Sequence, residues 1–321
     1  MRAIQVSEHG GPEVLQYVEV ADPQIGPSQL LVDTQGVGVN YIDIYFRTGQ
    51  YPQATPYIPG SEGTGIVAAV GADVTDFAVG DRVAWAAAPG SYADKVAVDA
   101  AVAVTVPDGV DPTVAAAALL QGMTAHYLVE SVFRPEPGDP VLIHAGAGGV
   151  GLLLTQMAAA KGARVITTVS TDDKEKLSRA AGAAEVLRYG DDLAAQVREL
   201  TGGAGVAAVY DGVGASTFEA GLASLRVRGT LALFGAASGA VPPFDPQRLN
   251  PAGSLWLTRP SLGAYTRDRA EFLWRATDVF DGIAAGTLTF RIGATYPLAD
   301  AAQAHRDLAG RKTTGSIVLL P

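Results

Sequence analysis

Short hydrophobic or alternating runs, broken by glycine and proline, occupy the first hundred residues of the chain. Alternation over a strand length predicts β-structure, because every second side chain then faces the same side of a sheet. Clusters such as Gly10-Gly11-Pro12 are typical of the turns between strands. The strands expected here cover residues 30–39, 65–70, 82–85 and 92–98. This pattern predicts a β-rich N-terminal domain.

The pattern changes at Asp111-Pro112, a pair typical of a helix N-cap and first helical residue. Strand and helix patterns then alternate as far as residue 234. We expect strands at 141–143, 164–169, 185–187, 206–210 and 229–234, and helices at 150–161, 172–181, 191–200 and 215–225. Parallel strands joined through helices form right-handed crossovers, so this stretch predicts a doubly wound parallel sheet.

The last part of the chain, residues 235–321, has a mixed pattern. A proline-rich loop at 242–251 precedes a possible strand at 254–258, helices at 269–285 and 299–309, and a closing strand at 316–320. A chain of 321 residues is long enough for about two domains. The predicted fold class is α/β, with a β-rich domain and a doubly wound domain.

The amino-acid composition excludes several classes of function. The 33 acidic and 23 basic residues give a net charge of -10, which disfavours binding to nucleic acid or to an anionic membrane surface. Because the chain has no cysteine, disulfides, thiolate nucleophiles and sulfur-ligated zinc are excluded. Polar residues follow Met1 too early for a secretory signal, and no apolar run is long enough to span a membrane. We expect a cytoplasmic protein.

One glycine motif carries the most specific chemical signal. Gly146-x-Gly148-x-x-Gly151 follows the apolar strand at 141–143 and opens the helix at 150–161. In this context the first glycine permits a tight turn, the second lets the backbone approach a pyrophosphate, and the third lets helix and strand pack closely. The helix N-terminus adds amide donors. The motif predicts dinucleotide binding.

The end of the next strand bears on the choice of dinucleotide. Enzymes that use NAD commonly place a carboxylate there, whereas this chain has Ser170, with Lys174 four residues later. A hydroxyl and an ammonium group would suit a 2′-phosphate, which favours NADPH. Two alternatives stay open: Lys174 is merely solvated on its helix, or Asp172 turns inward to the ribose.

Several segments together resemble the quinone oxidoreductase, or zeta-crystallin-like, branch of the medium-chain dehydrogenase/reductase superfamily. They are residues 38–43, 59–65, 122–125, 144–151, 209–214, 233–235 and 258–262. The resemblance implies a GroES-like catalytic domain made of residues 1–122 and 262–321, with a Rossmann domain at 123–261 inserted. It also implies NADPH and a quinone in a cleft between the two domains, and a homodimer in which residues 254–258 extend the sheet.

Zinc-dependent members of the superfamily differ at two positions. They carry a catalytic cysteine near position 40 and a histidine that aligns with Ser61, where this chain has Asn40 and Ser61. An amide and a hydroxyl are poor zinc ligands, so the resemblance implies a site without metal. Because alcohol oxidation needs a Lewis acid or a matched base, quinone reduction fits this chain better.

The resemblance also assigns roles to individual residues. For the substrate cleft it implies Asn40, Tyr45, Tyr51 and Arg259. For the cofactor it implies Gly146, Ala147, Gly148, Gly149, Val150 and Gly151 at the pyrophosphate, Ser170, Lys174, Tyr189 and Arg311 at the 2′-phosphate, and Thr124, Phe234, Gly235 and Ser261 at the nicotinamide.

Structural explanations compete with some of these roles. Tyr45 and Tyr51 could simply close the edge of a core, and Asn40 could cap a helix that begins near position 41. For Asp43 and Glu62 we expect a salt bridge or a helix-start position rather than acid–base chemistry. None of the four histidines forms an i, i+4 ligand pair, and we expect His144 to be a hydrogen-bonded residue at a strand end.

These observations predict an NADPH-dependent oxidoreductase that transfers a hydride, or single electrons, to a quinone. Holding two planar reactants together would supply most of the catalysis. Reduction of an activated alkene, such as an enone or 2-alkenal, is the nearest alternative because it needs the same geometry. A non-catalytic NADPH-binding protein is the alternative from another class.

Overall fold

The computed structural model describes residues 1–321, and the chain divides into two units. The first unit comprises Met1–Met123 and Thr266–Pro321, so it contains both ends of the chain. The second is the continuous stretch Thr124–Tyr265. The boundary falls within helix α2, Pro112–Tyr127, whose N-cap is Asp111, as its sequence predicts: Asp111 Oδ1 accepts from the amide of Thr113 at 2.7 Å.

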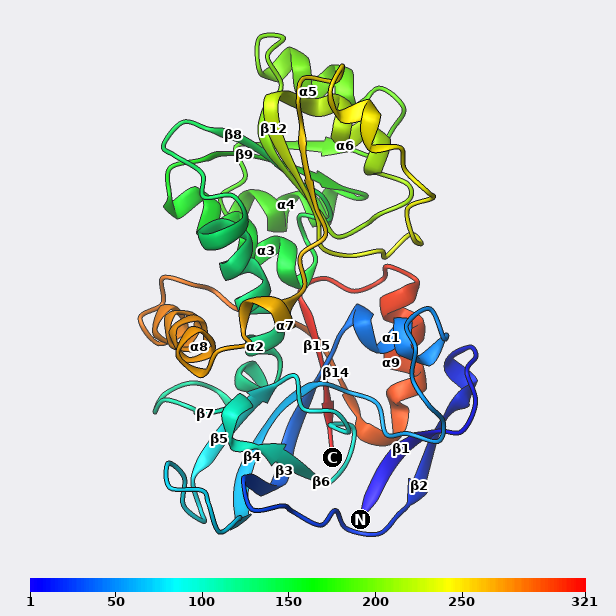
Figure 1. The fold of residues 1–321 in the computed structure, drawn as a ribbon, viewed down its shortest axis with the longest axis vertical. Coiled ribbons are helices and arrows are strands. Elements are labelled where there is room, and N and C mark those ends of the chain that lie inside the picture. Colours follow the sequence, from blue (N-terminus) through cyan, green and yellow to red (C-terminus); the bar gives the residue numbers. More distant parts are fainter. The chain divides into compact units, whose positions relative to one another are not determined.

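The first unit is built on a seven-stranded sheet with the order β14-β15-β3-β4-β5-β7, in which β6 also pairs with β3 (Figure 1). Its strands are β3 Gln29–Val39, β4 Glu62–Val70, β5 Arg82–Ala86, β6 Lys95–Asp99, β7 Ala103–Thr105, β14 Ile292–Pro297 and β15 Ser316–Leu320. A separate pair, β1 Arg2–Val6 and β2 Leu15–Glu19, is antiparallel. Strand β15 pairs with β3, so the C-terminal segment completes the N-terminal sheet.

The sequence-based expectation for this sheet is confirmed for most strands, although β4 begins at Glu62 rather than residue 65 and the short β7 was not expected. Strand β6 begins at Lys95 rather than Tyr92, because Tyr92 exchanges backbone hydrogen bonds with Ile4 and Pro59 instead of β3. Strand β14 was not expected, and it pairs in parallel with β15. The helices of this unit are α1 Tyr41–Arg47, α8 Arg269–Ala284 and α9 Ala301–Ala309.

The second unit is a doubly wound parallel sheet, as expected. Its order is β10-β9-β8-β11-β12-β13, and every pair in it is parallel. Numbered along the chain this is 3-2-1-4-5-6, the Rossmann order. The strands are β8 Pro140–Ile143, β9 Arg164–Val169, β10 Glu185–Arg188, β11 Val206–Asp211, β12 Leu225–Leu233 and β13 Trp256–Thr258.

Helices cover both faces of this sheet (Figure 1). They are α3 Gly149–Ala160, α4 Asp172–Ala180, α5 Leu193–Leu200 and α6 Phe218–Ser224, with a short α7 at Leu262–Tyr265. Helix α6 is shorter than its sequence predicts at both ends: it begins at Phe218 rather than residue 215, and it ends at Ser224 because Leu225 already starts β12. Buried aliphatic and aromatic side chains, including Ile166, Val209 and Phe218, pack between the sheet and α5 and α6. The sheet is thus fixed by a continuous apolar core.

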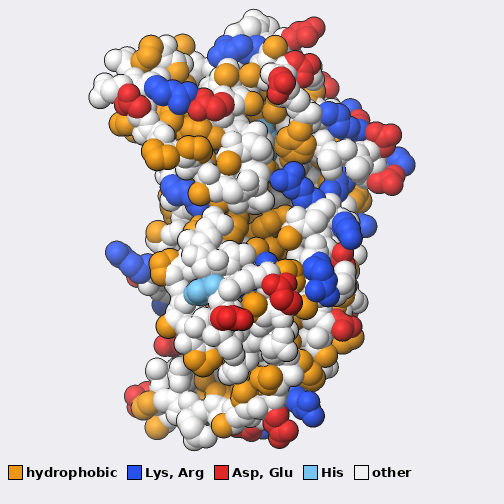
Figure 2. Space-filling model, turned by 90° about the vertical axis from the view of Figure 1, so that its right-hand side faces the viewer, with side chains coloured by type: hydrophobic (Ala, Val, Ile, Leu, Met, Phe, Trp, Pro, Cys, Tyr) orange, Lys and Arg blue, Asp and Glu red, His pale blue; other side chains and the backbone are white.

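The surface shows no segregation of charge on the face drawn in Figure 2, where acidic and basic side chains are interspersed among apolar ones. No helix combines the length and the apolar character that crossing a bilayer requires.

Candidate active site

The glycine motif forms the turn between β8 and α3. The amide of Gly146 donates to the carbonyl of Thr168 at 3.0 Å, which ties the turn to β9. A Cβ atom at Gly146 would lie 2.6 Å from Thr167 Cβ, and one at Gly151 would collide with the carbonyl of Ala145. The first and third glycines are therefore required by packing, in agreement with the motif's structural logic.

The turn exposes backbone donors rather than side chains. Gly148 is the N-cap of α3 and has no side chain with which to accept the amides of the first turn. Those amides have no acceptors within the helix, and the helix dipole adds partial positive charge at the same end. Ala145 adopts a left-handed conformation with φ 54° just before the turn. The residues present fit a diphosphate, which would accept from these donors.

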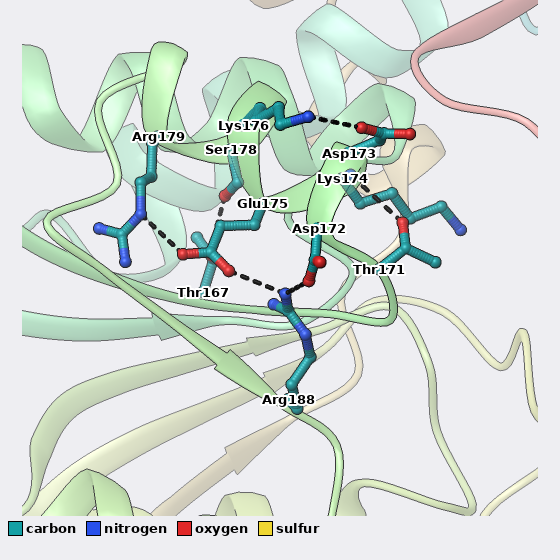
Figure 3. Close-up of polar contacts among 10 residues, drawn as sticks. All are labelled: Thr167, Thr171, Asp172, Asp173, Lys174, Glu175, Lys176, Ser178, Arg179 and Arg188. Atoms are coloured by element: carbon teal, nitrogen blue, oxygen red, sulfur yellow. Dashed lines mark hydrogen bonds and ion pairs between the residues drawn. The ribbon is translucent and has the colours of Figure 1, made fainter.

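The neighbouring strand ends in the two residues expected at the 2′-phosphate. Ser170 directly follows β9, and Lys174 lies in the first turn of α4, where its amino group donates to Ser170 Oγ at 3.3 Å. The hydroxyl of Thr171 caps the helix by accepting from the Lys174 amide (Figure 3). Asp172, the competing ribose ligand, is instead paired with Arg188, with Oδ1 and Nη2 2.7 Å apart.

Tyr189 lies beside the same turn. It follows β10, and its hydroxyl accepts from the amide of Ala145 at 3.0 Å. Its ring stacks on His144, with centroids 6.3 Å apart. His144 is only partly hydrogen-bonded: Nδ1 lies 3.0 Å from Thr168 Oγ1, whereas Nε2 is buried without a partner. Burial lowers the pKa of this histidine, so the neutral ring is favoured.

The remaining candidates in this unit also follow strand ends. Phe234 and Gly235 come after β12, and Arg259 and Ser261 come after β13. Parallel strands bring their carboxyl ends to one edge of the sheet, so these residues share the edge that carries the glycine turn. Gly235 has no room for a side chain, because a Cβ would collide with the carbonyl of Gly212. Thr124 differs, since it lies on α2.

In the first unit, Asn40 belongs to a buried polar network that we name the Asn40 network: Asn40, Glu62, Gln121 and Ser316. Asn40 Nδ2 donates to Glu62 Oε1 at 2.6 Å, and Asn40 Oδ1 accepts from Gln121 Nε2 at 3.0 Å. Glu62 Oε2 accepts from the amide of Leu120 at 2.9 Å. The Ser316 hydroxyl donates to Gln121 Oε1 at 2.6 Å. Strands β3, β4 and β15 and helix α2 thus fix one orientation of the Asn40 amide.

Glu62 corrects the expectation from sequence. It forms no salt bridge and starts a strand rather than a helix; its carboxyl group is fully buried against hydrogen-bond donors. Burial raises its pKa to about 8. Space for this carboxyl group depends on Gly38, since a Cβ there would collide with Glu62 Oε1.

Asp43 has the helix-start role expected of it. Its Oδ2 accepts from the backbone N–H of Asn40 at 2.8 Å at the start of α1. It also accepts from the Tyr92 hydroxyl at 2.9 Å. Tyr92 in turn lies 3.1 Å from His305 Nε2, and His305 Nδ1 lies 3.1 Å from Arg47 Nη1. Because an arginine only donates, His305 accepts at Nδ1 and carries its proton at Nε2. Burial raises the pKa of Asp43 to about 7 and lowers that of His305 to about 3.

The two substrate-site tyrosines pack together. The ring centroids of Tyr45 and Tyr51 are 5.1 Å apart, and the Tyr51 amide donates to the Tyr45 carbonyl at 3.0 Å. Tyr45 is 6% exposed, so much of it closes the apolar edge. Arg311 follows α9 in the first unit with φ 57°, whereas Ser170, Lys174 and Tyr189 belong to the second.

Sequence reasoning missed Gln121 and Arg188 altogether and gave Glu62 the wrong setting. Each contacts a candidate residue that is distant in sequence or on another element, so no local pattern identifies the pair. The one usable signal was the glycine at 38, whose missing side chain leaves room for Glu62. No group of three or more His, Cys, Asp or Glu side chains that could hold a metal is present.

Comparisons with known proteins agree with this geometry. Residues 26–108 match the family model described as "Alcohol dehydrogenase GroES-like domain", and residues 149–273 match "Zinc-binding dehydrogenase". A quinone oxidoreductase of Pseudomonas aeruginosa is 42% identical, with 100% of this chain and 99% of that protein covered.

Two further proteins are similar over their full length. A 2-haloacrylate reductase of a Burkholderia species is 40% identical, covering 99% of this chain and 98% of that protein. A mycobacterial protein solved as a complex with NADPH is 58% identical, with all of both chains covered and a TM-score of 0.98. The chain therefore belongs to the quinone oxidoreductase branch of the medium-chain dehydrogenase/reductase superfamily.

Proposed function

We propose that this protein is an enzyme that uses NADPH to reduce quinones. The observation that carries the proposal is the edge of the parallel sheet, where a glycine-rich turn offers amide donors and Lys174 and Ser170 follow the neighbouring strand. The similar quinone oxidoreductase and the similar NADPH complex support the same conclusion.

The cofactor roles divide among three groups of residues. The turn from Gly146 to Gly151 would hold the diphosphate, while Ser170, Lys174, Tyr189 and Arg311 would hold the 2′-phosphate. Thr124, Phe234, Gly235 and Ser261 would border the nicotinamide. When bound, NADPH supplies a hydride from C4 of its nicotinamide ring.

The substrate roles fall to Asn40, Tyr45, Tyr51 and Arg259. Asn40 Nδ2 donates one hydrogen to Glu62 and carries a second. Because the network holds the amide in place, this second hydrogen would be a fixed donor for the substrate. Arg259 brings a guanidinium group, which only donates hydrogen bonds. Donors of this kind stabilise negative charge that develops on a carbonyl oxygen during reduction, and they act without reorganising. The two tyrosines would orient a planar acceptor.

Reduction of an activated alkene is the second candidate function. The observation that favours it is the 40% identity to a 2-haloacrylate reductase over nearly the whole of both chains. A conjugated acid or aldehyde also accumulates charge on oxygen when its C=C bond is reduced, so the same donors would serve.

A substrate panel tests the proposal. We expect NADPH oxidation with 1,4-benzoquinone and 1,4-naphthoquinone, and kcat/KM values at least tenfold above those for 2-alkenals and 2-chloroacrylate. A reversed preference would establish the alkene reductase instead. Binding of NADPH without turnover on any of these substrates would leave a non-catalytic binding protein.

We also infer a homodimer. Strand β13 lies at the edge of the six-stranded sheet, and Trp256 on it is 68% exposed. Val227, on the adjacent strand β12, is 69% exposed. An edge strand with a large exposed apolar side chain favours pairing with a second copy. Sedimentation velocity should give twice the mass of the chain, and a monomer at micromolar concentration would contradict the inference.

A further inference from the structure

Asp172 occupies a sensitive position for cofactor choice. It is the first residue of α4 and comes two residues after Ser170, at the strand end where NAD enzymes place a ribose-binding carboxylate. A carboxylate aimed at that point favours the two ribose hydroxyls of NADH and repels a 2′-phosphate. The direction in which Asp172 points therefore matters for the selectivity of the site.

Arg188 controls this direction in the structure. It is the last residue of β10 and pairs in register with Val169, so its side chain reaches α4 from the neighbouring strand. Its Nη2 lies 2.7 Å from Asp172 Oδ1 and 2.8 Å from Glu175 Oε2. In Figure 3 both carboxylates converge on this guanidinium, whereas the Lys174 amino group extends away from it.

The two carboxylates do not depend on Arg188 equally. Glu175 is also paired with Arg179, with Oε1 and Nε 2.8 Å apart. Arg188 is the one ion-pair partner found for Asp172. Together Arg179, Arg188, Asp172 and Glu175 are balanced in charge, so loss of Arg188 leaves one net negative charge next to Ser170 and Lys174.

We propose that Arg188 is a specificity-determining residue that favours NADPH over NADH by holding Asp172 and Glu175 away from Ser170 and Lys174. It acts through the two carboxylates rather than by touching the 2′-phosphate. The proposal rests on the proposed function, because it concerns the choice between two forms of the same cofactor.

The test compares steady-state kinetics with NADPH and NADH at a saturating quinone concentration. In Arg188→Met we expect kcat/KM for NADPH to fall about fivefold at low salt, because an exposed charge acts over a screened distance. The value for NADH should stay constant or rise. The loss should shrink when 0.5 M NaCl is added. A purely structural defect would lower kcat/KM for NADPH and for NADH by the same factor, and added salt would not change that loss.

Rescue by a second substitution separates indirect from direct action. Adding Asp172→Asn to Arg188→Met removes the released charge, so most of the NADPH activity should return. If Arg188 instead binds the phosphate directly, the double variant stays as poor as the single one, and the proposal is wrong.

Matched variants complete the experiment. Arg179→Met removes the same charge from this group of four residues but leaves the pair between Arg188 and Asp172 intact, so its NADPH-to-NADH ratio should change much less than that of Arg188→Met. Arg188→Lys keeps the charge and should also stay close to the wild type, which covers the case that Arg188→Met does not fold. An equal loss of NADPH selectivity in Arg179→Met would overturn the proposal. If the wild-type protein oxidises neither cofactor, the proposed function itself fails.

Discussion

Two polar regions of this protein are built in opposite ways. The Asn40 network is buried and contains no ion pair, and its Glu62 carboxyl group accepts hydrogen bonds from Asn40 and Leu120. The charged cluster on α4 lies at the surface and consists largely of ion pairs, among them Asp172 with Arg188 and Lys176 with Asp173 (Figure 3). Desolvation dominates the first region and solvent screening the second.

The difference assigns them different tasks. A buried donor that loses its acceptor cannot turn to water, so the Asn40 network holds one geometry and tolerates little change. Exposed ion pairs contribute little to stability, because water already solvates both charges. They still shape the local potential felt by a charged ligand. The first region is suited to orienting a reacting group and the second to selecting a cofactor.

The largest effect is expected from Glu62→Ala. It leaves Asn40 Nδ2 buried without its acceptor, at a cost of about 1–3 kcal/mol, and removes one acceptor of the Leu120 amide. We expect the free energy of unfolding in urea to fall by about 1–3 kcal/mol. Quinone kcat should fall at least tenfold, because the Asn40 amide is no longer held.

Glu185→Ala provides a matched control, since that carboxylate also lies on a strand but forms a half-exposed pair with Arg164. It should change the free energy of unfolding by less than about 0.5 kcal/mol. If both variants behaved alike, burial would not be what distinguishes the two regions.

The pH dependence of stability is the second prediction. Burial raises the pKa of Glu62 from 4.5 to about 8 and that of Asp43 from 3.8 to about 7. In the unfolded chain both groups ionise near pH 4, so between pH 4 and 8 the folded state binds more protons. Stability from these groups is full below pH 4 and is lost as pH rises toward 8. His305 acts in the opposite sense, and its contribution is lost as pH falls from 6.5 toward 3.

Glu62→Gln removes one of the two raised carboxyl groups. Its melting temperature should therefore decline less than that of the wild type between pH 5 and 8. The comparison uses the slope, because the amide also loses one hydrogen bond and lowers stability at every pH. Identical slopes for the two proteins would show that Glu62 is already ionised in the fold across this range.

The smallest effect is expected at the surface. Lys176→Ala removes the pair with Asp173, in which both side chains are more than three-quarters exposed. The free energy of unfolding should equal that of the wild type within the error of a urea titration, at low and at high salt. A clear loss of stability in that titration would mean that the α4 cluster stabilises the fold cooperatively.

Local patterns in the sequence accounted for most of the elements. Periodicity located β9 and β15 at their observed bounds, and Asp111-Pro112 marked the start of α2. Strand β14 was not predicted, because its residues, Ile292–Pro297, are at most half-buried and carry no strong hydrophobic pattern. The end of α6 was misplaced because Leu225 is equally suited to a buried helix or strand position.

The glycine turn could be recognised from sequence because all of its requirements are local. Gly146, Gly148 and Gly151 act through backbone shape within a few residues of each other. The polar partners could not be recognised in this way. Asn40, Glu62 and Gln121 come from three separate elements, and a carboxylate in a sequence gives no sign of whether it is solvated, paired or buried.

By itself, then, the sequence determined the alternation of strands and helices, the phosphate-binding turn and the absence of thiol chemistry, since each depends on residue type and short spacing. Tertiary structure alone decided that Glu62 is buried against Asn40 and that Asp172 is turned toward Arg188. Burial and charge pairing depend on which distant segments meet. Those contacts form only when the chain folds and these segments are packed together away from water.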